Sequence, residues 1–577
     1  MNSTRKIFLA IISVAVAVAV ILAITVNRRD AGTIGASQNQ VATEPPGTVI
    51  VTIASSVTKQ KWMEAVVGKF HAEGAKTADG SPIRIEVKGV LSGGSMSKIL
   101  DGKLKPVVWS PGADSWVQQF RELWAQQGRP PVVAQDCKAS VYSPIGLAMW
   151  RPMAEALGWP DRPIGWKSIS DLASDPRGWA RYGHPEWGRL KLGHPHPKYS
   201  SAGMLYMASF VYGVTGKTGG LSVADIYAPK VTKAMGVLAQ NTSKYGMIST
   251  DLLRLMAQHG PAFLHAVSAF EEGTVRLNLE RRKDLRWPLV FIFPSEGTFW
   301  SSHPYCIMEG ADWVDAKQTE AAVKFLDYLL AEMQQALAVR HLLRPLDSRI
   351  PIRSPLSLDN GADPRVRPDS VPALEMPDAR ATAAIIDQFL ITKRKSTILL
   401  ALDVSGSMSG PNIRAATQAT AAFLKRLHPD DQVGLMTFGT DVVVASPILP
   451  VSSVAEDLSK RVLDLIAGGH TNLYGAVCDG MNMLQELRRK QTENRLYGMV
   501  LLSDGQDTKH RVSENQMFST CLPSSAEAEG IKVFSIAFGN EADRAVLNRI
   551  STVSGGRMYE ADSNSIERIY LNISAEQ

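Results

Sequence analysis

The chain of 577 residues is too long for a single hydrophobic core, so its length predicts two to four domains. An apolar content of 45% with 20% charged residues is typical of globular domains and excludes disorder for most of the chain. The formal charge of +6 comes without a dense Lys/Arg stripe or interleaved aromatic residues, which argues against nucleic acid as a partner.

The N-terminal region contains an uncharged stretch, residues 7–26, in which only Ser13 and Thr25 are polar. At about 1.5 Å per residue, this stretch can cross a hydrocarbon core of roughly 30 Å. A membrane helix and a long signal sequence both explain it, and we favour an uncleaved anchor because charged residues follow it directly. We therefore expect a single-pass anchor over 1–29, with its orientation left open by basic residues on both sides, and a flexible linker over 30–47.

Units of one strand and one helix begin at Thr48. The first unit has a Ser-Ser turn at 55–56, the second a Ser-Gly-Gly-Ser turn at 92–95, and a third strand ends in the turn 111–115. Each turn stands between a strand and a helix. Because strand carboxyl ends and helix amino ends of an open sheet face one crevice, these turns predict a site for an anion or a polar small molecule.

Several segments occur in an order that resembles the bacterial extracellular solute-binding proteins of the molybdate-type class. They are IASSVTKQKWMEAVVGKF, LSGGSMSKILDGKLKPVVWSPGADSWV, VYSPIGLAMW, HPHPKYSSAGMLYM and FPSEGTFWSSHPYCIMEGADW. The resemblance covers roughly 48–390 and implies two lobes that close around a solute, with VYSPIGLAMW as the first hinge crossing. Carried over by position, the cleft would be lined by Ser55, Ser56, Ser92, Ser95, Ser143 and Ser201.

These turns contain no obvious Arg or Lys that would mark a strongly charged oxyanion. The GHPHP segment, with His194 and His196, is interpreted as an ordinary loop because it lacks a third metal ligand at a fixed spacing. No nucleophile motif is present either, so the sequence does not indicate an enzyme.

A Pro-rich stretch over 351–377 and a helix that follows it lead into a second domain, and we place the boundary between 48–394 and 395–577. Apolar strands there alternate with amphipathic helices, which predicts a mostly parallel, doubly wound sheet of the Rossmann-like α/β class. The expected strands are ILLAL, QVGLMTF, DVVVA, GMVLLS and KVFSIAF, and the expected helices lie near 412–427, 453–467, 472–490 and 543–552.

Polar residues follow three expected strand or helix boundaries of this domain: Asp403, Ser405, Ser407, Thr471 and Asp504. The pattern D-x-S-x-S, then Thr, then Asp resembles the metal-ion-dependent adhesion site of von Willebrand factor A domains. The resemblance implies a site for Mg²⁺ (or Mn²⁺ or Ca²⁺) made of hydroxyl and carboxylate oxygens. It also implies a protein partner that completes the metal's coordination with a carboxylate.

The four cysteines divide evenly between the two expected domains, with no Cys-x-x-Cys pair. Free buried thiols are one explanation, and one disulfide per domain is the one we favour behind an export-type segment. Because Cys137 precedes the first hinge crossing and Cys306 lies beside the returning one, we expect that pair to bond. We expect Cys478 to bond with Cys521.

Together these patterns predict an N-terminal membrane helix, a two-lobed periplasmic-binding-protein-like domain and a C-terminal von Willebrand factor A domain. The expected function is that of a membrane-anchored binding protein with both domains extracytoplasmic. It would hold a small solute in one domain and bind a protein through magnesium in the other. Two alternatives are a solute-binding component of an ABC-type transport system and an accessory subunit of an ATP-driven chelatase-type complex.

Overall fold

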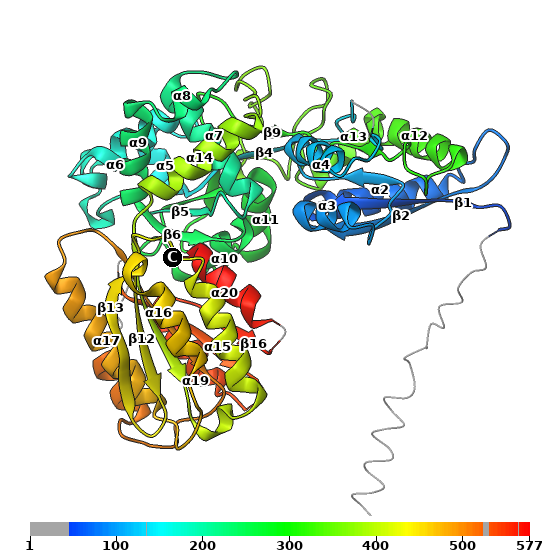
Figure 1. The fold of residues 1–577 in the computed structure, drawn as a ribbon. Helices are drawn as coiled ribbons and strands as arrows, with labels where there is room; N and C mark the ends of the chain where they lie inside the picture. Colours follow the sequence, from blue (N-terminus) through cyan, green and yellow to red (C-terminus); the bar gives the residue numbers. More distant parts are fainter. Residues whose placement is uncertain (1–44, 134–135, 523–529, 540, 564, 577) are drawn as a thin grey trace, which may run out of the picture.

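The computed structural model describes residues 45–577 except 134–135, 523–529, 540, 564 and 577, and contains three α/β bodies (Figure 1). Two lobes lie side by side, and the C-terminal domain packs beneath the second lobe. Within the described residues, no helix has both the length and the apolarity needed to cross a membrane. The anchor expected over 1–29 lies outside the described residues.

The first lobe has a four-stranded sheet in the order β10-β3-β1-β2, in which β1 pairs in parallel with β2 and β3. β10 runs antiparallel to β3 and is contributed from much later in the chain. The strands are β1 (Val49–Ser56), β2 (Ile83–Val90), β3 (Val108–Ser110) and β10 (Cys306–Ile307). The helices are α2 (Gln60–Ala72), α3 (Ser92–Leu100), α4 (Asp114–Gln126), α12 (Ala316–Leu330) and α13 (Glu332–Arg340).

The second lobe has a sheet in the order β6-β5-β7-β4-β8, with the short β9 paired to β4. Its strands are β4 (Ser143–Trp150), β5 (Leu192–Pro195), β6 (Thr242–Gly246), β7 (Ala266–Phe270), β8 (Leu289–Ile292) and β9 (Trp300–Ser301). Its main helices are α5 (Arg151–Leu157), α6 (Trp166–Ser174), α7 (Ser201–Thr215), α8 (Val223–Ile226), α9 (Pro229–Gln240), α10 (Ser249–His259), α11 (Glu271–Arg281) and α14 (Ala379–Thr392). The GHPHP segment was expected to be a loop, but His194 lies in β5. Residues 192–195 are buried there and pair in parallel with β6.

The chain crosses between the lobes three times. β4 is the first crossing, as expected from VYSPIGLAMW, β9 leads back to β10, and residues after α13 return to the second lobe. Tyr142 and Arg344 exchange main-chain hydrogen bonds of 2.8 and 2.9 Å at this hinge. The expected disulfide Cys137–Cys306 is confirmed and joins the first two crossings on the side of the first lobe.

The C-terminal domain has a six-stranded sheet in the order β13-β12-β11-β14-β15-β16, parallel except for β13. Its strands are β11 (Ser396–Asp403), β12 (Gln432–Phe438), β13 (Val442–Pro450), β14 (Leu496–Ser503), β15 (Lys532–Phe538) and β16 (Met558–Ala561). Side chains of α15 (Pro411–Leu424), α16 (Val451–Leu463) and α20 (Ile566–Glu576) pack on one face, and those of α17 (Leu473–Lys490) and α19 (Arg544–Val553) on the other.

All eight residues of β11 are buried, as continuous apolar sequence predicts for a central parallel strand covered on both faces. The doubly wound fold expected for this domain is therefore present. The expected disulfide Cys478–Cys521 is also confirmed, and it joins α17 to the segment that follows β14. The sequence interpretation missed β16 and α20, whose short apolar stretches give little periodic signal.

The C-terminal domain is fixed to the second lobe through polar contacts around β6. Lys532 Nζ donates to the Ser243 carbonyl at 2.8 Å, and Lys244 Nζ donates to the Gly555 carbonyl in the opposite direction. Arg557 forms an ion pair of 2.9 Å with Asp251. We call this contact region the seam.

Candidate functional site

The five residues expected to bind a metal come together at one edge of the C-terminal sheet. Asp403 ends β11, and Ser405 and Ser407 lie on the short helical turn that follows. Asp504 comes directly after β14, which pairs in parallel with β11, so the two strand ends meet at the same edge. Thr471 immediately precedes the turn that opens α17. We call this group of five residues the metal cup.

Hydrogen bonds join four of the five residues of the cup: Asp403, Ser405, Ser407 and Asp504. The Ser405 and Ser407 hydroxyls lie 3.1 Å apart, and Ser407 Oγ donates to Asp504 Oδ1 at 2.6 Å. A Cβ atom on Gly505 would lie 3.5 Å from Ser407 Oγ and 3.7 Å from Thr471 Oγ1, which places the Thr471 hydroxyl beside the same backbone. Glycine at position 505 therefore leaves room between the two hydroxyls.

Asp403 is fully buried and accepts from the Ser405 main-chain N–H at 2.8 Å and from Ser503 Oγ at 2.6 Å. Burial, opposed by these hydrogen bonds and assisted by the charge of Asp504, raises the pKa of Asp403 to about 6. A cation between the two carboxylates would offset the desolvation cost of both charges. The buried acid therefore fits a metal.

The donor set also fits the expected class of metal. It offers only oxygens, two from carboxylates and three from hydroxyls, which suits a hard cation such as Mg²⁺. No group of three or more His, Cys, Asp or Glu side chains placed to hold a metal ion occurs in the described part of the chain. Asn412, which sequence reasoning missed, donates to Asp504 Oδ2 at 3.2 Å and helps to orient it.

Three of the serines expected to line the solute cleft meet at the strand ends of the first lobe. Ser56 caps the short helix before α2, and Ser92 Oγ accepts from the Gly112 N–H at 3.0 Å. A Cβ atom on Gly112 would lie 3.4 Å from Ser56 Oγ and 3.6 Å from Ser92 Oγ. Ser55 is fully buried next to Ser56. The first three turns of the chain are therefore brought together as expected.

The other expected cleft serines are placed differently. Ser95 is buried, and its hydroxyl donates to the Ser92 carbonyl and accepts from Trp109 Nε1, so it packs inside the first lobe. Ser143 lies opposite Ser301 across the β4–β9 ladder at the hinge, and both hydroxyls are buried without a partner in the described chain. Ser201 opens α7 in the second lobe, where Ser200 is the capping residue.

Lys59 and His303 are two further candidate residues beneath these turns. Lys59 is fully buried, and its Nζ donates to the Ser110 carbonyl at 2.8 Å. Both ring nitrogens of His303 are buried without a partner among the described residues, and the charge of Lys59 adds to burial in lowering its pKa. A lysine three residues after the Ser-Ser turn was the sequence signal for this cation, and it lies just outside the turns, which themselves contain no Arg or Lys.

Lys59 provides a test of this buried cation. Burial lowers its pKa from 10.5 to about 7, so between those values the unfolded chain binds more protons than the folded chain. The Lys59 side chain therefore makes the native protein more stable as the pH rises through this window. Lys59→Met lacks this contribution. We expect the native protein to gain about 2 kcal/mol relative to Lys59→Met between pH 7 and 9, measured by denaturant unfolding. A pH-independent difference would show that Lys59 is not desolvated.

Comparisons with known proteins match both halves of the chain. Residues 51–341 match the family model for bacterial extracellular solute-binding protein, and residues 397–571 match the model for von Willebrand factor type A domain. Inter-alpha-trypsin inhibitor heavy chain H1 from Bos taurus is 25% identical over 195 residues, 32% of this chain and 20% of that protein. Heavy chain H4 from Homo sapiens is 26% identical over 182 residues, 30% of this chain and 19% of that protein.

Two solved structures illustrate the likeness of each half. An ABC transporter from Clostridium perfringens covers 59% of this chain and 98% of its own, with 14% identity and a TM-score of 0.40. The von Willebrand factor type A structure from Catenulispora acidiphila covers 32% of this chain and 42% of its own, with 16% identity and a TM-score of 0.29. The chain spans about a fifth of the length of the heavy-chain relatives it matches.

Proposed function

Since the chain belongs to the bacterial extracellular solute-binding proteins and carries a C-terminal von Willebrand factor type A domain, we propose that it is a membrane-anchored, extracytoplasmic binding protein. Its two-lobed domain binds a small solute, and its C-terminal domain binds a protein through a divalent cation. The observation that carries this proposal is the metal cup, in which five oxygen donors from three separate segments meet at one sheet edge.

In the proposed site, Mg²⁺, or Mn²⁺ or Ca²⁺ in its place, is held by Asp403, Ser405, Ser407, Thr471 and Asp504. A bound divalent cation would supply a positive centre that still accepts a carboxylate from a protein partner, since few of its ligands are charged. The chain's own contribution is orientation. Ser503 and the Ser405 N–H hold the Asp403 carboxylate, and Asn412 and Ser407 hold that of Asp504.

The environment of the first-lobe turns favours an anionic or strongly polar solute. Lys59 lies beneath them and forms no ion pair with a described carboxylate, while the Ser143 and Ser301 hydroxyls at the hinge lack partners. Buried polar groups without partners are costly, and a solute that accepts and donates hydrogen bonds there would satisfy them. The proposed cleft therefore uses Ser55, Ser56, Ser92 and Ser143, with Lys59 as the added cation.

The extracytoplasmic location is supported by the disulfides Cys137–Cys306 and Cys478–Cys521, since such bonds persist mainly in oxidising compartments. Protease treatment of intact cells producing the full chain tests this location. Both domains should be digested while a cytoplasmic marker protein stays intact. Protection of the C-terminal domain in intact cells would contradict the proposal and favour the chelatase-type alternative, because that role requires ATP.

A further inference from the structure

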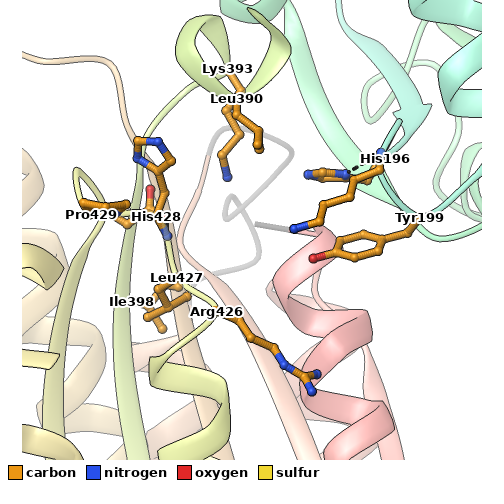
Figure 2. A pocket seen from close by; sticks show the side chains of 11 residues that line it. His196, Tyr199, Leu390, Lys393, Ile398, Arg426, Leu427, His428 and Pro429 are labelled. Atoms are coloured by element: carbon orange, nitrogen blue, oxygen red, sulfur yellow. Dashed lines mark hydrogen bonds between the residues drawn. The ribbon is translucent and has the colours of Figure 1, made fainter. Parts of the chain in front are cut away.

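A cavity of ≈ 160 Å³ lies between the second lobe and the C-terminal domain (Figure 2), and none of its lining residues belongs to the metal cup or to the first-lobe turns. Three segments that are distant in sequence line it: the loop after β5, the end of α14, and the connection from α15 to β12 together with β11. Its lining residues are His196, Lys198, Tyr199, Leu390, Lys393, Ile398, Arg426, Leu427, His428, Pro429 and Asp431. Both the solute-binding domain and the C-terminal domain therefore contribute to it.

The polar lining is mainly cationic. Lys198, Lys393 and Arg426 are the lysine and arginine side chains of the lining, and Asp431 is the single carboxylate among the lining residues. Burial lowers the pKa of Lys393. Both oxygens of Asp431 already accept main-chain hydrogen bonds, from Ser396 at 2.7 Å and from His428 at 3.2 Å. The lining thus has more positive charge than its own carboxylate can balance, which makes the cavity attractive to an anion.

His196 adds an uncharged donor to this lining. Its side chain is 4% exposed, and its Nδ1 accepts from the Lys198 N–H at 3.2 Å, which leaves the proton on Nε2. Burial, with the charges of Lys393, His194 and Lys198, lowers the pKa of His196 to about 2, so the ring is neutral at physiological pH. Within the described chain, no group accepts a hydrogen bond from Nε2.

The side chains are arranged around the cavity rather than stacked on one another. Figure 2 shows Lys393 extending from the end of α14 into the space between His428 on one side and His196 with Tyr199 on the other. Arg426 lies at the far end of the cavity from Lys393. Lys393 is buried, whereas Lys198 and Arg426 are exposed, so an ion entering from solvent would meet the two exposed side chains first and Lys393 last.

We propose that this cavity binds a small soluble phosphate-bearing anion, of about the size of inorganic pyrophosphate, that bridges the two domains. Phosphate oxygens accept several charge-assisted hydrogen bonds at once, from lysine as a point charge and from arginine in a forked geometry. The cavity is large enough for a multi-atom ion rather than one water molecule. Because its donors come from both domains, the anion stabilises the seam.

Titration of inorganic pyrophosphate into the full chain, with chelator present to keep the metal cup empty, tests this inference by calorimetry and thermal unfolding. The native protein should bind it and unfold at a higher temperature when it is present. Lys393→Met should weaken binding by about tenfold or more and remove the rise in unfolding temperature. The variant should still fold, because methionine replaces a buried charge with an apolar chain of similar length.

Lys395→Met is the matched control, because it removes the same charge two positions away. Lys395 pairs with Asp430 at 3.1 Å and does not line the cavity, so this variant should bind pyrophosphate nearly as well as the native protein. Equal weakening in both variants would show a general charge effect and overturn the proposal. Unchanged binding in Lys393→Met would place the anion elsewhere, and no binding by the native protein at millimolar pyrophosphate would also overturn it.

Discussion

Asp403→Ala is expected to abolish magnesium-dependent binding of a carboxylate-bearing partner and to weaken magnesium binding by about 100-fold or more. The expectation follows from the place of Asp403 in the cup. Mutating a residue that only orients a metal ligand typically lowers metal affinity by about 10- to 100-fold, and Asp403 is proposed as a ligand itself. Calorimetric titration of Mg²⁺ or Mn²⁺ into the full chain, with and without a carboxylate ligand, measures both effects. The solute cleft should be unaffected.

The matched control for Asp403 is Asp507→Ala. Asp507 is also a buried carboxylate of the C-terminal domain and also accepts main-chain hydrogen bonds, from Tyr474 at 3.2 Å and His510 at 2.8 Å, but it does not belong to the cup. The Asp507→Ala variant should have a lower free energy of unfolding than the native protein but the same affinity for the metal. Equal metal affinity in Asp403→Ala and the native protein would contradict the proposed metal site and indicate that the D-x-S-x-S stretch is an ordinary capped turn.

Arg344→Met is expected to lower the free energy of unfolding by about 3–5 kcal/mol. Arg344 is buried at the hinge, where Nε and Nη2 bind the two oxygens of Glu271 at 2.6 and 2.7 Å. Side-chain exposures of 3% and 1% mean that the substitution leaves an uncompensated carboxylate out of contact with water. Denaturant unfolding of the full chain, followed by tryptophan fluorescence, measures the loss.

Two further variants separate the buried charge from general loss of contacts. Adding Glu271→Gln to Arg344→Met should restore part of the stability, because the orphaned charge is removed. Arg349→Met breaks a pair with Asp347 at 2.6 Å whose arginine is 89% exposed, and it should cause no measurable change. Equal effects of Arg344→Met and Arg349→Met would contradict the assignment of the hinge pair as a buried ion pair.

The sequence was most informative where the functional residues lie close together along the chain, in a recognisable motif. Asp403, Ser405 and Ser407 occupy one strand end, and parallel pairing of β11 with β14 brings Asp504 to the same edge, so the residues that the resemblance grouped do lie together. The disulfides followed from an even count of cysteines per domain. The lobes and the first crossing followed from the order of several segments.

Residues whose role depends on distant contacts could not be predicted in this way. A serine in the first turn of a helix can face the crevice or the core, and Ser95 faces Trp109 because its position on α3 points inward. His303 comes within the electrostatic influence of Lys59 only because β10 returns to the first sheet. The seam cavity joins segments near 196, 393 and 428, and no pattern along the chain links them.

The seam has a mechanical consequence. The described chain enters the first lobe at β1, whereas the metal cup belongs to the domain that is fixed to the second lobe through Lys532, Lys244 and Arg557. A pull between a partner held at the cup and the start of β1 must therefore pass across the boundary between the lobes. If the cup binds a protein and the cleft a solute, as we propose, such tension would draw the two halves of the cleft apart, and load on the protein contact would oppose retention of the solute.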